Sequence, residues 1–228
     1  MFVAIPVPDA VGRTLTARLR RLPRDVVEGL RATPPDTLHL TLRFLGHVPR
    51  SLVPDLCSVI SAAAVPALPF ELRLGSLQWL GNGRSGVLAA GVLSDGSLGE
   101  LHDRLEVGLE RLGFEPERRP FRPHLTLARA RGRREGDRRH LAAVADAFLG
   151  LSWPADAMIL FESHLEAAGA RHEPLGVARF RGGPVAAEAD GRIAGTPGQR
   201  PTARSRGMQS TCRSPSEHAS SPPSDSST

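Results

Sequence analysis

The sequence predicts a mixed fold of helices and strands in which two similar halves are followed by a tail. Three observations support this prediction. Segments with helical and strand periodicity alternate along residues 1–181, one tetrapeptide occurs in both halves, and the composition changes near Arg181. A chain of 228 residues is long enough for one bilobal domain. We therefore expect an ordered domain over residues 1–181.

Hydrophobic periodicity, prolines and glycines define the expected elements. Strands are expected at residues 2–7, 37–45, 70–80, 86–93, 121–128, 155–165 and 172–180. Helices are expected at residues 10–30, 52–64, 97–112 and 140–149. Each half then has the order strand, helix, strand, helix, strand, and the last strand can pair back on the domain.

The repeated tetrapeptide is His-Leu-Thr-Leu, at residues 39–42 and again at residues 124–127. Side chains alternate between the two faces of a strand, so His39 and Thr41 share one face and the leucines share the other. The same holds for His124 and Thr126. One copy of so short a motif is commonly only a half-buried strand, but two copies in matching places indicate shared chemistry. If the halves pack about an approximate two-fold axis, two imidazoles and two hydroxyls converge.

Two imidazoles and two hydroxyls suit a reaction at phosphorus. One neutral imidazole can accept a proton from water while the other, protonated, gives a proton to the departing oxygen, because the pKa of histidine allows both roles near neutrality. Threonine hydroxyls can donate hydrogen bonds to phosphate oxygens. Arg129, five residues after His124, is the nearest candidate guanidinium for the developing charge.

The charge distribution adds a hint about the partner. The chain has a net charge of +5, and nine arginines fall between Arg118 and Arg139. Such a density favours a polyanionic partner, but a solvated arginine-rich loop explains it about equally well. Residues 182–228 are rich in Gly, Pro, Ser, Ala and Thr and have hardly any large apolar residue, so we expect a disordered tail there.

Other sequence features bound the setting of the protein. The N-terminus lacks a secretory signal pattern, and no apolar stretch approaches the roughly 18 residues of a membrane helix. A disulfide between Cys57 and Cys212 is not expected, because their surroundings differ so much. We therefore expect a protein of the cytoplasm with no membrane partner.

The remaining histidines do not form a recognisable metal-binding pattern. Neither a His-Glu-x-x-His sequence nor paired cysteines occur, and no glycine-rich phosphate loop with a lysine is present. We expect no metal and no cofactor. His102 is expected on an exposed helix face, and His164 and His172 are given no role.

Residues 38–46 and 119–129 resemble the two signature strands of the 2H phosphoesterases. More narrowly, they resemble those of the bacterial and archaeal RNA 2',3'-cyclic phosphodiesterases once named 2'-5' RNA ligases. The opening Phe2-Val3-Ala4-Ile5-Pro6 and the pair Gly113-Phe114 fit the same family. The resemblance covers residues 1–181 and stops at the tail.

The resemblance implies a bilobal α+β fold with an antiparallel sheet in each lobe and the active site in the cleft between them. It implies metal-independent hydrolysis of a 2',3'-cyclic phosphate to leave a 2'-phosphate. His39 would protonate the leaving 3' oxygen, and His124 would activate water. The implied substrate contacts are Thr41, Thr126 and Arg129 for the phosphate and Phe44 for the terminal base.

Three alternatives stay open at this point. The same residues could join RNA ends through a 2'-5' bond, since microscopic reversibility gives both directions one site. The chain could be a module that binds RNA ends without catalysis, or it could act on small cyclic nucleotides or 2'-5' linked oligonucleotides. The expected partner is an RNA with a 2',3'-cyclic phosphate end, tRNA fragments among them, bound by a monomer.

Overall fold

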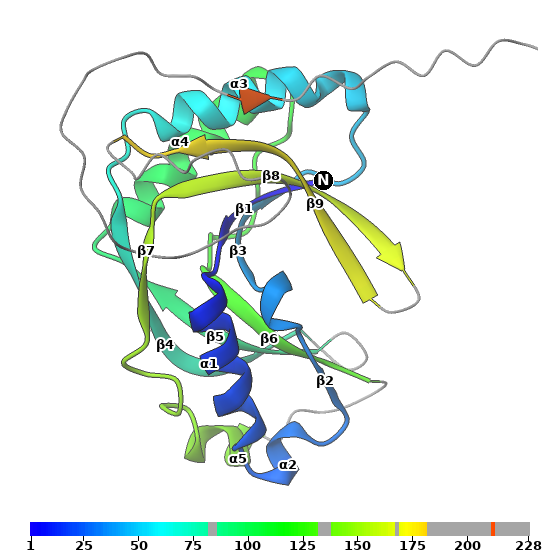
Figure 1. The fold of residues 1–228 in the computed structure, drawn as a ribbon, viewed down its shortest axis with the longest axis vertical. Coiled ribbons are helices and arrows are strands. Elements are labelled where there is room, and N and C mark those ends of the chain that lie inside the picture. The colour runs from blue at the N-terminus through cyan, green and yellow to red at the C-terminus, as the bar shows by residue number, and fades with distance from the viewer. Residues whose placement is uncertain (82–85, 132–137, 167–168, 182–210, 213–228) are drawn as a thin grey trace, which may run out of the picture.

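The computed structural model describes residues 1–81, 86–131, 138–166, 169–181 and 211–212 (Figure 1). The strands are β1 (Phe2–Pro6), β2 (Leu30–Ala32), β3 (His39–Phe44), β4 (Phe70–Leu80), β5 (Val87–Leu93), β6 (His124–Ala130), β7 (Ser152–Ala155), β8 (Ala157–Glu166), β9 (Gly169–Arg179) and β10 (Thr211–Cys212). The helices are α1 (Asp9–Arg20), α2 (Arg24–Val27), α3 (Val53–Ala64), α4 (Ser97–Arg111) and α5 (Arg138–Ala143), with 3-10 turns η1 (Pro35–Thr37) and η2 (Arg50–Leu52).

The strands form two antiparallel lobes that join at β3 and β6. The first lobe has the order β10-β9-β8-β1-β3, and the second has the order β6-β5-β4-β7 with β2 also paired on β6. The pair that joins the lobes is Leu40 with Leu125. The bilobal α+β fold expected from the sequence is confirmed.

The two halves of the chain are intertwined between the lobes. Strand β4, from the first half, pairs with β5 and β7 in the second lobe. Strands β8 and β9, from the second half, belong to the first lobe, where β8 pairs with β1. Each lobe therefore contains strands from both halves of the sequence.

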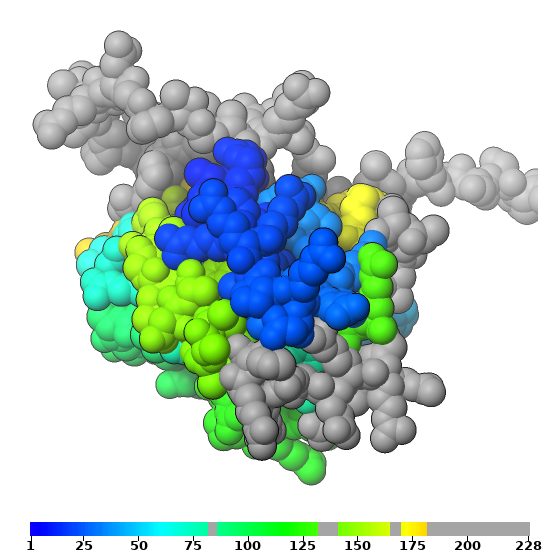
Figure 2. All heavy atoms as spheres, turned by 90° about the horizontal axis from the view of Figure 1, so that it is seen from below, coloured from blue at the N-terminus to red at the C-terminus, as the bar shows by residue number. Residues whose placement is uncertain are grey.

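Each lobe is covered by its own helices (Figure 1). Helices α3 and α4 lie against the first lobe, and one face of α4 buries Leu98, Leu101, Leu105 and Leu109 at the spacing of a helical stripe. Helices α1, α2 and α5 lie at the second lobe. Figure 2 shows from below that α1 and α2 adjoin the segment after α5, where Arg18 donates to the carbonyls of Ala147 and Leu149.

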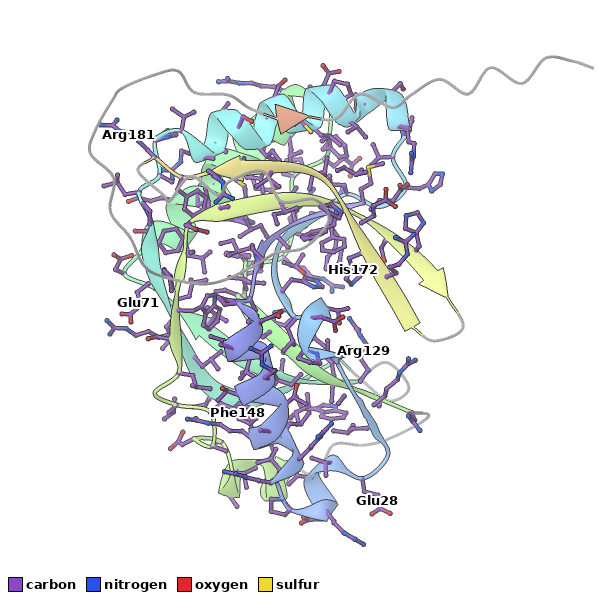
Figure 3. All side chains as sticks on the ribbon, in the orientation of Figure 1. Glu28, Glu71, Arg129, Phe148, His172 and Arg181 are labelled. Atoms are coloured by element: carbon purple, nitrogen blue, oxygen red, sulfur yellow. The ribbon has the colours of Figure 1, made fainter. Side chains whose placement is uncertain are left out.

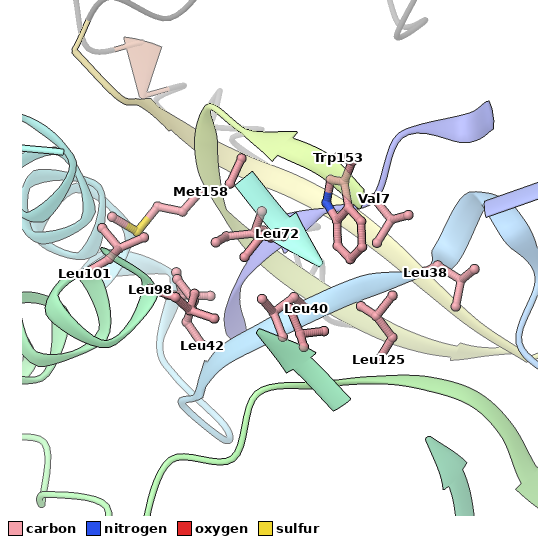
Figure 4. Packing of buried hydrophobic residues seen from close by; sticks show 14 of the residues in the cluster. Val7, Leu38, Leu40, Leu42, Leu72, Leu98, Leu101, Leu125, Trp153 and Met158 are labelled. Atoms are coloured by element: carbon pink, nitrogen blue, oxygen red, sulfur yellow. The ribbon is translucent and has the colours of Figure 1, made fainter. Parts of the chain in front are cut away.

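The leucines of the repeated tetrapeptide lie in the hydrophobic core (Figure 4). Leu40 and Leu125 are completely buried, and Leu42 and Leu127 nearly so. Replacing such a leucine by alanine typically costs about 2–5 kcal/mol, so this face of each strand is strongly fixed. The opposite face, with the histidines and threonines, is thereby held away from the core.

Four of the expected elements differ from the observed ones. The helix expected at residues 10–30 ends at Arg20, because Pro23 cannot continue it, and the chain goes on through α2 into strand β2. The strand expected at residues 121–128 begins at His124, after Pro120 and Pro123. The helix expected at residues 140–149 is the shorter α5, and the strand expected at residues 155–165 divides at Asp156 into β7 and β8.

The expectation for the cysteines is wrong. Cys57 is disulfide-bonded, and the part of the chain that the structure describes holds no free cysteine. The cysteines therefore give no support to a reducing compartment. Of the expected tail, the described residues are Thr211–Cys212, which pair with β9, and the rest of residues 182–228 lies outside the described ranges. Across those ranges, no helix combines the length and apolar character that crossing a bilayer requires.

Candidate active site

The junction of the two lobes brings the four repeated polar residues together. Because Leu40 is the antiparallel partner of Leu125, the neighbouring positions place His39 opposite Thr126 and Thr41 opposite His124. All four side chains are half-buried, whereas the leucines between them are buried. We call this surface the His-Thr face. Each histidine thus faces the threonine of the other copy.

The two histidines are held by the same hydrogen bond. Nδ1 of His39 donates to the carbonyl of Thr37 at 2.7 Å, and Nδ1 of His124 donates to the carbonyl of Arg122 at 2.7 Å. A carbonyl oxygen can only accept, so Nδ1 carries the hydrogen in both rings. In the neutral state Nε2 of each ring is then the free base, and that atom is the one available to exchange protons.

A β-bulge brings Phe44 onto the His-Thr face. In the pairing of β3 with β1, Val3 pairs with Arg43 and Ala4 pairs with Thr41, so Leu42 is skipped. Leu42 and Arg43 are consequently both buried, and the alternation restarts one position later. Strict alternation from His39 would have put Phe44 on the leucine face. The bulge instead leaves it on the outside, 66% exposed.

A second bulge does the same for Arg129. In the pairing of β6 with β5, Leu88 pairs with Ala128 and Ala89 pairs with Thr126, so Leu127 is skipped. Arg129 is exposed, on the same face as His124 and Thr126. It stands five residues after its histidine, as Phe44 stands five residues after His39. The duplicated bulges therefore set an aromatic ring and a guanidinium in equivalent places.

Burial changes the pKa of His39. Desolvation lowers it from 6.5 to about 4, although the hydrogen bond to the Thr37 carbonyl opposes this, and the charges of His172, Arg129 and His124 lower it further, the two histidines only when they are protonated. His39 is therefore neutral in the free protein near pH 7. The influence of Arg129 on His39 is consistent with its place on the same face of the sheet.

Sequence reasoning missed an aromatic cluster beside His39. The ring of Phe2 lies 4.8 Å from that of His39 and 5.9 Å from that of Phe44, measured between centroids. Phe161 stacks on Phe2, and His172 lies 5.1 Å from His39. Phe161 and His172 come from β8 and β9, whose pairing beside β1 is a long-range contact with no local signal in the sequence.

A buried ion pair fixes the segment that leads into the second histidine. The guanidinium of Arg43, nearly buried, contacts Glu106 of α4 at 3.3 Å and Glu117 at 3.6 Å, and it donates to the carbonyl of Glu115. Losing one partner of such a pair typically costs about 3–5 kcal/mol. These contacts of Arg43 connect β3 to α4 and to the loop before β6.

His102 supports the same segment. Its ring stacks on Phe121 with 4.0 Å between centroids and 10° between planes. The expectation of an exposed histidine on the face of α4 is wrong, because this contact leaves His102 only 9% exposed.

The described part of the chain contains no cluster of three or more His, Cys, Asp or Glu side chains arranged to hold a metal ion. The groups of the His-Thr face can exchange protons and donate hydrogen bonds. Together with Arg129 they form a site for an anion with several oxygens, and phosphate is the group that such donors fit.

Comparisons with known proteins point to one family. A family model described as the 2'-5' RNA ligase superfamily matches residues 7–167. A Thermus thermophilus protein named RNA 2',3'-cyclic phosphodiesterase is 32% identical over 209 residues, which cover 88% of this chain and 98% of the relative. A Bacillus subtilis protein of the same name is 25% identical over 165 residues, 72% of this chain and 87% of that one.

Solved structures show the same fold. The crystal structure of a Thermus thermophilus protein superposes with a TM-score of 0.66 at 28% identity, over 79% of this chain and 97% of its own. The crystal structure of E. coli LigT complexed with 3'-AMP gives a TM-score of 0.62 at 25% identity, over 78% and 96%.

Proposed function

Because the chain belongs to the 2'-5' RNA ligase superfamily, we propose that it hydrolyses the 2',3'-cyclic phosphate at an RNA end and leaves a 2'-phosphate. The observation that carries the proposal is the crossed arrangement of His39 with Thr126 and His124 with Thr41, with Nδ1 of both rings donating to a backbone carbonyl. The names of the relatives support the same reaction.

The proposed reaction needs two proton transfers. Nε2 of His124 accepts a proton from water as the water oxygen bonds to phosphorus. The bond from phosphorus to the 3' oxygen breaks, and Nε2 of protonated His39 gives its proton to that oxygen. One water is added overall. Each positioned acid or base typically contributes on the order of 10²–10⁴ in rate.

The acid receives its proton when the substrate binds. In the free protein His39 is neutral, since burial and nearby positive charge hold its pKa at about 4. A bound phosphate anion compensates the charge of Arg129 and raises that pKa. Thr41, Thr126 and Arg129 hold the phosphate oxygens. Phe44, exposed beside Phe2, offers a ring for the terminal base, and such stacking is typically worth about 1–3 kcal/mol.

We further propose that the protein acts as a monomer in the cytoplasm, on RNA fragments such as cleaved tRNA. Every proposed site residue comes from one chain, so no second copy is needed to complete the site. Sedimentation at the concentration of the activity assay checks the monomer.

The decisive experiment is an assay on an oligonucleotide with a 2',3'-cyclic phosphate end, with EDTA present. We expect conversion to the 2'-phosphate product at an undiminished rate, because imidazoles supply both proton transfers. A matched oligonucleotide with a 3'-phosphate is the control and should stay unchanged. Strict dependence on an added divalent ion would contradict the mechanism, and no conversion at all would contradict the function. Joined oligonucleotides would instead reveal the 2'-5' ligation direction.

A further inference from the structure

A third imidazole stands beside His39, and the proposed mechanism does not use it. His172 lies on β9, and its ring meets that of His39 at 87° with 5.1 Å between centroids. Phe2 at 5.0 Å and Phe161 at 6.3 Å flank the same ring. These aromatic contacts fix the place of the His172 ring in the site.

The two nitrogens of His172 have different surroundings. Nδ1 is buried and has no hydrogen-bond partner within the described ranges, whereas Nε2 is not among the buried atoms that lack a partner there. A buried N–H without an acceptor destabilises the fold, so the neutral ring keeps its hydrogen on Nε2. Burial, and then the charge of Arg129, lower the pKa of His172, so the ring is a neutral donor near pH 7.

Arg129 relates this donor to the phosphate. The positive charge of Arg129 acts on both His39 and His172. Figure 3 shows His172 on β9 in the first lobe and Arg129 on β6 in the second, where the two lobes meet. An anion that pairs with Arg129 therefore comes within reach of both rings.

We propose that His172 is a further substrate-binding residue, whose Nε2–H donates a hydrogen bond to a nonbridging oxygen of the phosphate held by Arg129. The inference rests on the proposed function only in identifying that phosphate with the RNA end. A neutral donor has an advantage at this position. A second fixed cation there would oppose protonation of His39, whereas a neutral N–H binds the oxygen without that penalty.

Binding of inorganic phosphate tests the proposal without requiring catalysis. Calorimetry at pH 7 would compare wild type with His172→Phe, which keeps a ring but removes the donor, and with His172→Gln, which keeps an N–H donor. We expect the Phe variant to bind about 10- to 100-fold more weakly, the range of a hydrogen bond to a charged group, and the Gln variant to recover most of the affinity. His164→Gln is the control. Its ring lies on β8 beside Glu162 and Glu173, so phosphate binding should not change.

Unchanged affinity in His172→Phe would overturn the proposal, and so would equal losses in all three variants or a Gln variant no better than Phe. Nitrogen NMR of the wild-type histidines covers the case in which the Phe variant does not fold. The neutral His172 ring should carry its hydrogen on Nε2 and shift on titration with phosphate, and the opposite tautomer or no shift would refute the donor. If phosphate binding depends on His172 but the wild type is inactive on cyclic phosphate, the proposed function is wrong and the role of His172 in binding phosphate stands.

Discussion

His39 and His124 have the same neighbours along the chain and the same hydrogen bond to a carbonyl two residues earlier. Their surroundings in the folded protein differ, because the rings of Phe2, Phe161 and His172 pack around His39. At the scale of single residues, the fold therefore gives different surroundings to two groups whose local sequences are the same.

The two histidines should be separable by the leaving group. His39→Ala and His124→Ala should each lower the rate on cyclic-phosphate RNA by on the order of 10² or more, because each removes one proton transfer. Wild type should give a bell-shaped pH profile. A nitrophenolate leaving group needs no proton, so such a substrate should rescue His39→Ala more than His124→Ala. Rescue of His124→Ala instead would exchange the roles, and full activity of either variant on the RNA would refute the mechanism.

The buried His39 should also appear in the pH dependence of stability. Its pKa is about 4 in the folded protein and near 6.5 when unfolded, so the unfolded chain takes up the proton first as the pH falls. The contribution of His39 to the free energy of unfolding is fully present above pH 6.5. It is lost between pH 6.5 and pH 4, by on the order of 3 kcal/mol. Urea unfolding should therefore show a smaller loss of free energy from pH 7 to pH 5 in His39→Gln than in wild type. Equal losses would mean that His39 is solvated.

At the scale of elements, the duplicated bulges decide which side chains join the His-Thr face. Each bulge skips one leucine and turns the position five residues after the histidine outward. In β3 that position holds Phe44, and in β6 it holds Arg129. The same backbone irregularity therefore places two side chains of different chemistry on the His-Thr face.

Removing the phosphate contacts of β6 should weaken catalysis without unfolding the protein. Thr126→Ala and Arg129→Ala should each cost about 1.5–3 kcal/mol in kcat/KM, the range of a hydrogen bond to a charged group. Arg131→Ala, two residues further along and also exposed, is the matched control and should keep its activity. Thermal melts would show that folding is intact. If both site variants kept full activity, the phosphate pocket would lie elsewhere.

The alternation of strand residues was enough to predict the His-Thr face and the four residues on it. It was not enough to place Phe44, because a bulge breaks the period of two that such a prediction assumes. His172 was missed for another reason. The sequence predicts a strand at residues 172–180, but only the pairing of β9 with β8, and of β8 with β1, brings this histidine to His39. Local patterns do not record such long-range partners.

At the scale of the whole molecule, the proposed site lies between lobes that are joined through one strand pair. Thr211–Cys212 pairs with β9, and Cys57 of α3 is disulfide-bonded. Every proposed site residue precedes residue 173. We therefore expect the segment after residue 181 to contribute to stability rather than to the reaction.

Deleting residues 182–228 should leave the rate on cyclic-phosphate RNA unchanged. Without reductant, the deletion should lower the melting temperature, because it removes Cys212, and a disulfide is typically worth about 2–4 kcal/mol. With dithiothreitol the two proteins should melt within a few degrees of each other, and full-length Cys57→Ser should behave like the deletion. A large loss of activity would place part of the site in the segment.

The interleaved order of the strands has a consequence during synthesis. Strand β1 pairs with β8, where Phe2 is the partner of Phe161. One edge of β1 therefore stays unpaired until β8 has been synthesised. A nascent chain that ends before β8 exposes the unpaired edge of β1, and such edges are sites of aggregation. Neither lobe can be released early as a folded unit. Folding is therefore completed only after β8 has been synthesised. By then both histidines of the proposed site are already part of the chain.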